Sequence, residues 1–338
     1  MIALQYRLVK PFILETAYND ISVDEGVIIK PKYLSVCKAD MRYFFGQRDP
    51  EVLCRRLPMA LIHEACGEIL YDPARKFKRG QKVILLPNIP GKDEYYAENY
   101  RLDSVFRSSR ADGFMQEIIA MEPEALVGYS DRLPDNLMAF TEFISVGVHA
   151  VDTFIKSAGK RKNHIAVWGD GALSYVVCSV LKCVLPRTKI TVIGINPAKM
   201  QYFTFVDETL NIHQVQKKPQ YDHCFECVGG GGSGAAVSQM IDTIQPEGTI
   251  VLLGVSEEPV PVNTRMVLEK GLTMIGRSRS GRGDFEKTVE ILETNSAFSR
   301  RMKHLISQVV EVRNINDINH AFDLAKTADF KVVMKWDI

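Results

Sequence analysis

The segment IAVWGDGALSYVVCSVLKCVL, residues 165–185, decides the fold of this chain. Four apolar residues typical of a buried strand lead into a turn with Gly169 and Gly171, and an apolar helical pattern follows. The spacing G-x-G-x-x-S, which ends at Ser174, is close to the fingerprint of a dinucleotide-binding turn. Gly169 permits the tight turn, Gly171 lets a pyrophosphate approach the helix N-terminus, and Ser174 lets the helix pack on the strand. The segment therefore predicts a dinucleotide site; the alternative is a glycine turn that only caps a helix.

Apolar strand patterns and helical patterns alternate from this segment onward. The strand patterns lie at residues 165–168, 190–193, 221–226, 249–253 and 272–275. Strands separated by helices form βαβ units, whose strands lie parallel in one sheet. The sequence therefore predicts an α/β protein with a doubly wound parallel sheet. Residues 1–136 are short β patterns and turns, including a run at 27–31 that we expect to end at its proline.

The composition is that of an ordinary globular protein. Of 338 residues, 46% are hydrophobic and 25% are charged, which suits about two domains with a sizeable core. The formal net charge of +1 argues against nucleic acid as a partner. The apolar run at 171–181 is too short to span a membrane, and residues 1–7 lack the apolar core of a secretory signal. The seven scattered cysteines fit reduced thiols, so we expect a cytoplasmic protein without a membrane partner.

The end of the second strand pattern indicates which nicotinamide cofactor binds. An NAD site normally places Asp or Glu there to hold the ribose 2′-hydroxyl, whereas this strand ends at Gly194. Asn196 and Lys199 follow and suit a 2′-phosphate, so the sequence favours NADPH. The alternative is that Lys199 is a solvated helix residue and that both cofactors bind.

Three separated segments carry residues that bind metals. Cys37 stands three residues before Asp40, His63 and Glu64 are adjacent, and Glu142 lies where the chain enters the αβ region. Thiolate, imidazole and carboxylate are all zinc ligands, and a catalytic zinc keeps one position open. Without further context, Cys37 is more often a buried small side chain and His63 a core histidine.

In these motifs the whole chain resembles the zinc-dependent medium-chain dehydrogenase/reductase family, especially its polyol dehydrogenases. The matching pieces are Cys37 with Asp40 and residues 63–68, 77–83, 142–150, 169–174 and 225–229. The resemblance implies a GroES-like β-barrel catalytic domain, residues 1–136 and 282–338, into which a Rossmann domain, residues 137–281, is inserted.

The resemblance also implies that Cys37, His63, Glu64 and Glu142 surround one catalytic zinc, while Asp40 orients His63. Whether Glu64 and Glu142 bind the ion together stays open. The family's four-cysteine zinc lobe has no counterpart, because residues 88–106 contain no cysteine, so we expect no structural zinc.

The proton relay of the family is altered in this sequence. The usual relay positions hold Ala39 and Arg42, which cannot perform that role. Tyr43, Glu64 and a zinc-bound water molecule are the alternatives.

Three arginine clusters suggest a phosphorylated polyol as the substrate. They include Arg42, then Arg107 with Ser108, then Arg279, and the resemblance places all three near the substrate cleft. Arginine is preferred for phosphate recognition, and hydroxyls assist it. The alternative for each arginine is a solvated surface charge.

A closer resemblance, to the pentulose-phosphate reductases of this family, lies in several short segments. They are residues 42–43, 48–49, 106–109, 112–116, 168–171, 254–257, 262–265 and 278–281. It implies NADPH-dependent reduction of D-ribulose 5-phosphate to D-ribitol 5-phosphate for teichoic acid or capsule synthesis. It also implies a ribitol-5-phosphate cytidylyltransferase, which makes CDP-ribitol, as a partner, and we expect a homodimer. The alternatives are an NAD-dependent polyol dehydrogenase for an unphosphorylated sugar alcohol, and a zinc-free quinone reductase or silent NADP-binding protein.

Overall fold

The computed structural model describes residues 1–24 and 26–338, which form two compact units. One unit comprises residues 1–145 and 279–338, here called the barrel unit, and the other comprises residues 146–278, here called the nucleotide unit. Helix α4 (Thr141–Ser157) runs through the change from one unit to the other. The predicted domain limits at 136/137 and 281/282 stay a prediction.

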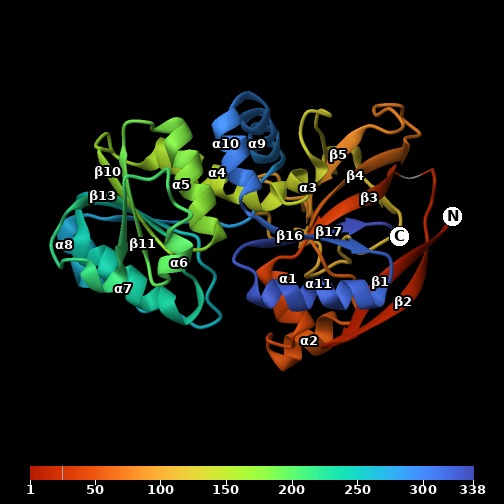
Figure 1. The fold of residues 1–338 in the computed structure, drawn as a ribbon, viewed down its shortest axis with the longest axis horizontal. Coiled ribbons are helices and arrows are strands. Elements are labelled where there is room, and N and C mark those ends of the chain that lie inside the picture. The colour runs from red at the N-terminus through yellow and green to blue at the C-terminus, as the bar shows by residue number, and fades with distance from the viewer. Residues whose placement is uncertain (25) are drawn as a thin grey trace. The chain divides into compact units, whose positions relative to one another are not determined.

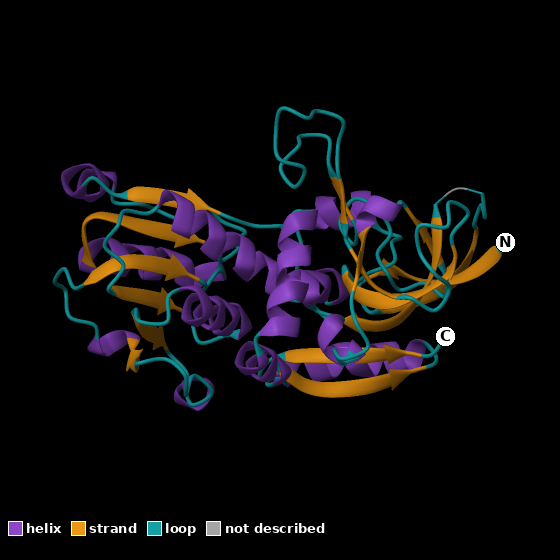
Figure 2. Ribbon diagram, turned by 90° about the horizontal axis from the view of Figure 1, so that it is seen from above, coloured by secondary structure: helices purple, strands orange, loops and turns teal. Residues whose placement is uncertain are grey.

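The nucleotide unit is built on a six-stranded parallel sheet in the order β12-β11-β10-β13-β14-β15. Figure 2 shows these strands side by side with helices around them. The strands are β10 (His164–Trp168), β11 (Lys189–Gly194), β12 (Glu208–Asn211), β13 (Tyr221–Glu226), β14 (Ile244–Leu252) and β15 (Thr273–Gly276). The connecting helices are α5 (Ala172–Val184), α6 (Pro197–Met200), α7 (Ser233–Thr243) and α8 (Thr264–Lys270).

The strand order reverses beside β10, and that reversal defines a binding position. The chain runs outward from β10 to β12, and then returns to the other side of β10 for β13 to β15. In such sheets, ligands bind beyond the carboxyl ends of the strands at the reversal. The turn at Gly169 follows β10 directly, so the predicted dinucleotide turn lies at this position.

The barrel unit contains a seven-stranded sheet in the order β16-β17-β3-β4-β5-β9, with β8 paired to β3. These strands are β3 (Val27–Ser35), β4 (Glu64–Tyr71), β5 (Lys82–Leu85), β8 (Ile119–Met121), β9 (Leu126–Gly128), β16 (Ile306–Val312) and β17 (Lys331–Trp336). Two hairpins add β1 (Ile2–Lys10), β2 (Ile13–Asp20), β6 (Asn88–Ile89) and β7 (Val105–Phe106). The helices are α1 (Lys38–Phe44), α2 (Pro50–Arg56), α3 (Asp135–Met138), α9 (Arg282–Thr294), α10 (Ser296–Lys303) and α11 (Ile315–Thr327).

A strand from the C-terminal part of the chain pairs with one from the N-terminal part in this sheet. Strand β17 lies beside β3 (Figure 1). The two strands are antiparallel, and Val333 lies opposite Ser35. The register places Lys331 beside the residues that follow β3.

Strand β3 is longer than the sequence suggested. It continues through Pro31 to Ser35, so the expected end at the proline is wrong. The register with β4 shifts between Pro31 and Tyr33, and such an irregularity tolerates the missing N–H of proline. The longer strand carries the chain to Cys37.

Candidate metal centre and cofactor site

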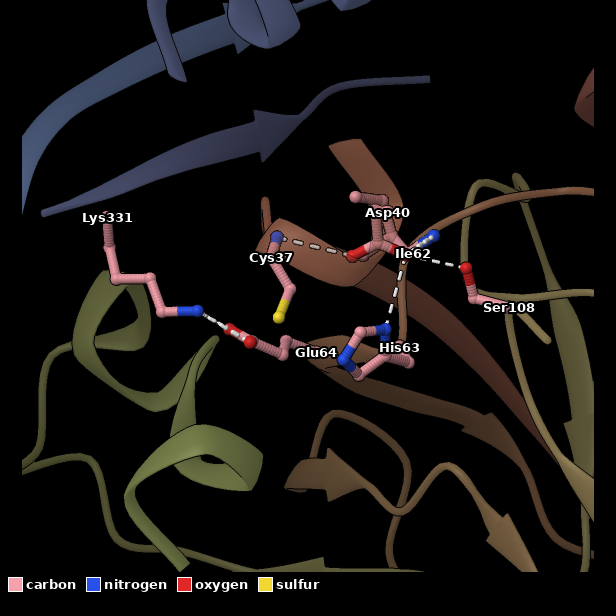
Figure 3. Close-up of polar contacts among 7 residues, drawn as sticks. All are labelled: Cys37, Asp40, Ile62, His63, Glu64, Ser108 and Lys331. Carbon is pink, nitrogen blue, oxygen red and sulfur yellow. Dashed lines mark hydrogen bonds and ion pairs between the residues drawn. The ribbon is translucent and has the colours of Figure 1, made fainter. Parts of the chain in front are cut away.

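Three of the four predicted metal ligands lie around the fourth, His63. Cys37 caps α1 shortly after β3, His63 directly precedes β4, Glu64 begins that strand, and Glu142 lies in the first turn of α4. The ligand atoms of His63, Glu64 and Glu142 all lie within 4.8 Å of one another, and so do those of Cys37, Asp40 and His63. Figure 3 shows the Cys37 thiol, the His63 ring and the Glu64 carboxylate converging.

Asp40 holds this centre together through one buried carboxylate. It contacts His63 Nδ1 at 3.2 Å and accepts hydrogen bonds from the Ser108 hydroxyl at 2.6 Å and the Ile62 N–H at 3.1 Å. The N–H of Cys37 also donates to it, at 3.2 Å. Because Nδ1 faces Asp40, the other ring nitrogen of His63 faces Cys37 and Glu64 (Figure 3). A carboxylate that orients a histidine in this way is typical of a metal site.

The electrostatics of the centre suit a cation. Burial opposes the charge on His63, but Asp40 and Cys37 outweigh it and raise the pKa of His63 well above its usual value. Burial raises the pKa of Glu142 to about 7, although the charge of His63 lowers it. A cation bound beside Glu142 would offset the burial that raises this pKa. Thiolate, imidazole and carboxylate together fit a zinc ion.

Lys331 is a member of the centre that sequence reasoning missed. Its Nζ lies 2.6 and 2.7 Å from the two carboxylate oxygens of Glu64, and both side chains are buried. The same Nζ lies 4.2 Å from the centre of the Phe143 ring. Its pKa is raised, because the charges of Glu64 and Cys37 outweigh the effect of burial. No local pattern marks this lysine, since 267 residues separate it from Glu64.

The glycine turn after β10 has the geometry that the sequence predicted. Gly169 has a φ of +120°, and a Cβ there would lie 2.7 Å from the Ser174 Oγ and 2.9 Å from the Cys227 carbonyl oxygen. Gly171 caps α5, and a Cβ at this position would meet open space. The N-terminus of α5 is therefore accessible to a phosphate group.

A carboxylate stands at the end of β11 although the strand itself supplies none. Asp170, from the turn after β10, accepts hydrogen bonds from the N–H groups of Ile195 and Asn196, both at 2.7 Å. Gly194 makes room for it, because a Cβ there would lie 2.7 Å from the Asp170 carboxylate. The inference that this strand end lacks an acid is therefore wrong. The dipeptide Asp170-Gly171 in the turn was the signal that could have revealed it.

The remaining predicted cofactor residues lie in α6. The side-chain oxygen of Asn196 accepts hydrogen bonds from the N–H groups of Ala198 and Lys199 and so caps the helix. Lys199 begins the last turn of this short helix.

The comparisons with known proteins identify the family. Residues 189–294 match the zinc-binding dehydrogenase family, and residues 23–131 match the alcohol dehydrogenase GroES-like domain. Ribulose-5-phosphate reductase 1 of Staphylococcus aureus is 43% identical over 99% of both chains. The chain belongs to the ribulose-5-phosphate reductase family. The ribulose-5-phosphate reductase of Bacillus spizizenii is 42% identical over 100% of both chains.

Solved structures of this reductase family confirm the predicted fold class. The crystal structure of S. aureus TarJ in complex with NADPH covers 100% of both chains with a TM-score of 0.90 and 39% identity. The chain is therefore an oxidoreductase with a GroES-like and a Rossmann part, as the resemblance implied. None of the helices in residues 1–24 and 26–338 combines the length and the apolar character needed to cross a membrane.

The predicted phosphate ligands of this reductase differ in what they contact. Arg107 donates from Nη1 to the Asp112 carbonyl oxygen at 3.1 Å and lies 5.8 Å from the centre of the Phe114 ring. The Ser108 hydroxyl is bonded to Asp40. The half-buried Arg279 belongs to the barrel unit, and its guanidinium lies 5.3 Å from the centre of the Phe106 ring.

The two other predicted residues lie on α1. Arg42 is in its last turn. Tyr43, the predicted relay candidate, is buried, and the Arg48 guanidinium lies 5.0 Å from the centre of its ring.

Proposed function

We propose that this chain uses NADPH and one zinc ion to reduce D-ribulose 5-phosphate to D-ribitol 5-phosphate. The observation that carries the proposal is the metal centre, where thiolate, imidazole and carboxylates gather around the His63 that Asp40 holds. Two relatives named ribulose-5-phosphate reductase, 43% and 42% identical over nearly the whole chain, support the substrate.

The reaction adds a hydride from the nicotinamide to the ketone carbon and a proton to the ketone oxygen. A zinc ion bound at this centre would polarise the carbonyl and stabilise the charge that develops on its oxygen. Cys37, His63 and Glu142 would hold the ion, with Glu64 as a further ligand. Asp40 keeps the His63 ring turned toward these residues.

The proton must come from a group near the ketone oxygen. Tyr43, Glu64 and a water molecule are the candidates. Lys331 occupies both oxygens of Glu64, so a relay through Glu64 requires this ion pair to open.

NADPH is the proposed hydride donor. The turn at Gly169 and Gly171 leaves the N-terminus of α5 accessible for the pyrophosphate, and Ser174 packs beneath it. The NADPH in the S. aureus TarJ structure, 39% identical, supports the choice. Asn196 and Lys199 are the proposed contacts of the 2′-phosphate beyond Gly194.

The setting of the enzyme is also part of the proposal. D-Ribitol 5-phosphate would pass to a cytidylyltransferase that makes CDP-ribitol, so that enzyme is the proposed partner. We further propose a homodimer in the cytoplasm. Nucleic acid is not among the proposed partners, because the net charge is only +1.

Initial rates on four substrate pairs test the function. The purified protein is assayed with NADPH or NADH and with D-ribulose 5-phosphate or D-ribulose, and its zinc content is measured. We expect fastest turnover with NADPH and the phosphorylated ketose. Turnover of free sugars alone would refute the proposed substrate.

A second candidate function is an NAD-dependent dehydrogenase for an unphosphorylated sugar alcohol. One observation favours it, the Asp170 carboxylate at the end of β11, where NAD-binding proteins carry an acid. NADH and a free polyol or its ketose would then give the fastest reaction in the same assay.

A further inference from the structure

The Phe106 ring lies close to both His63 and Arg279. Its ring centre is 5.5 Å from that of the His63 imidazole. The Arg279 guanidinium carbon is 5.3 Å from the same ring centre. One aromatic side chain therefore contacts both the candidate metal ligand His63 and a positive charge within the barrel unit.

The loop after Phe106 carries a second arginine, Arg110, whose charge acts on Arg279. The N–H of Arg110 donates to the Phe106 carbonyl oxygen at 2.9 Å, and the N–H of Ser108 donates to the Ala111 carbonyl oxygen at 2.8 Å. Ser108 has a φ of +58°, which turns the chain back on itself. The Ser108 side chain points to Asp40 (Figure 3), so the loop that carries Arg110 is tied to the metal centre.

Arg279 is held in an unusual backbone conformation. Its φ is +43°, a left-handed value that costs energy for any residue other than glycine. This strain is the kind found where a side chain must take one fixed direction at a binding site. The strained residue is the one whose guanidinium lies on Phe106.

Neither guanidinium group forms an ion pair with the described residues. In residues 1–24 and 26–338, no carboxylate lies within ion-pair distance of Arg110 or Arg279. Burial and the positive charge of Arg110 lower the pKa of Arg279, so the two like charges affect each other. Two adjacent cations without a counter-ion repel, and a bound anion would relieve that repulsion.

Arg107 is a weaker candidate for the same role. Its guanidinium already donates to a carbonyl oxygen and lies against the Phe114 ring, as described above. A phosphate ligand at Arg107 would have to compete with these contacts, whereas Arg110 and Arg279 are free of carboxylate partners among the described residues.

We propose that Arg110 and Arg279 form the subsite for the phosphate group of the ketose phosphate, with the Phe106 ring beside it. The proposal rests on the proposed function for its substrate. One guanidinium group can donate to two phosphate oxygens at once. Two arginines that bind the same phosphate would therefore fix the direction of the sugar chain. A phosphate held beside Phe106 leaves the carbonyl end of the substrate free to reach the metal centre.

The test compares two substrates that differ only in the phosphate. Arg110→Ala and Arg279→Ala are assayed with NADPH on D-ribulose 5-phosphate and on D-ribulose. We expect the ratio of the two kcat/KM values to fall roughly ten- to a hundredfold, the loss typical of a charged hydrogen bond. The Kd for NADPH and the zinc content of both variants should stay at the wild-type values. Arg279→Lys, which keeps the charge but loses the fork of donors, should lie between Arg279→Ala and wild type.

Two further arginine variants serve as controls. Arg300→Ala removes an exposed arginine of α10 and should leave the ratio unchanged. Arg107→Ala should change the ratio less than Arg279→Ala does. Arg110 is exposed, so its replacement keeps the test sound if the Arg279 variants fail to fold.

Each adverse outcome has a distinct meaning. Equal losses on both substrates, a weakened Kd for NADPH, or a selective loss in Arg107→Ala alone would overturn the subsite. A wild-type protein that does not turn over D-ribulose 5-phosphate would instead overturn the proposed function.

Discussion

Cys37 is the proposed sulfur ligand of the metal centre, and the proposal is best tested by removing this sulfur. We expect Cys37→Ser to lose most of its zinc and its turnover, because a hydroxyl is a poor zinc ligand. NADPH should still bind, since the glycine turn lies in the nucleotide unit. Zinc analysis, initial rates and cofactor fluorescence measure these effects. The exposed Cys54, changed to Ser, is the matched control. Full zinc and full activity in Cys37→Ser would exclude Cys37 as a ligand.

Lys331 compensates the buried charge of Glu64, and this role predicts a stability effect. Lys331→Met leaves Glu64 buried without a counter-ion, which costs about 3–5 kcal/mol when one partner of a buried pair is removed. We expect a lower thermal unfolding midpoint for the metal-free protein. The double variant Lys331→Met with Glu64→Gln should recover much of the loss. An unchanged midpoint in the single variant would show that the pair contributes nothing.

Asp170 lies at the end of β11, where a dinucleotide-binding protein distinguishes NADH from NADPH. Asp170→Asn removes the negative charge, while the amide oxygen still accepts hydrogen bonds from Ile195 and Asn196. Removing an acid near the adenosine ribose should raise the affinity for NADPH relative to NADH by roughly tenfold, about 1.4 kcal/mol. Titration of both cofactors measures the ratio. Equal weakening of both would mean that Asp170 only holds the turn.

The packing of α4 on α5 depends on Gly147. A Cβ at Gly147 would lie 2.5 Å from Cγ1 of Val176. Gly147→Ala should therefore destabilise the protein by about 1–3 kcal/mol, even though alanine favours helices. Denaturation measures the loss, and adding Val176→Ala should restore part of it. Gly234→Ala in α7, where the Cβ meets only ordinary contacts, should instead be neutral or stabilising. Similar effects of both alanines would contradict the packing argument.

At the scale of elements, the sequence predicted the strands and turns whose formation depends on residues close together in the chain. Five of the six strands of the parallel sheet and the glycine turn follow from apolar runs and spacing, and β13 has the predicted limits. The course of β3 beyond Pro31 was not predictable, because it depends on a shifted register with β4. Strand β12 was not predicted either, because its four residues include Glu208 and Asn211 and lack an apolar run.

At the scale of the molecule, long-range contacts complete the candidate site. The sequence named Cys37, His63, Glu64 and Glu142 through resemblance, and the structure brings them together. No local pattern predicts the contact of Lys331, and only the acid in the glycine turn hints at that of Asp170. Lys331 depends on the pairing of β17 with β3, and Asp170 reaches a neighbouring strand 25 residues away in sequence. Contacts of this kind follow from strand register, which a single sequence does not specify.

The most direct test of the metal centre is anomalous X-ray diffraction at the zinc absorption edge from crystals of the purified protein. The account predicts one zinc peak per chain, within bonding distance of the Cys37 Sγ and of the His63 nitrogen that faces away from Asp40. A chain without a peak there, or with its zinc bound elsewhere, would contradict the account.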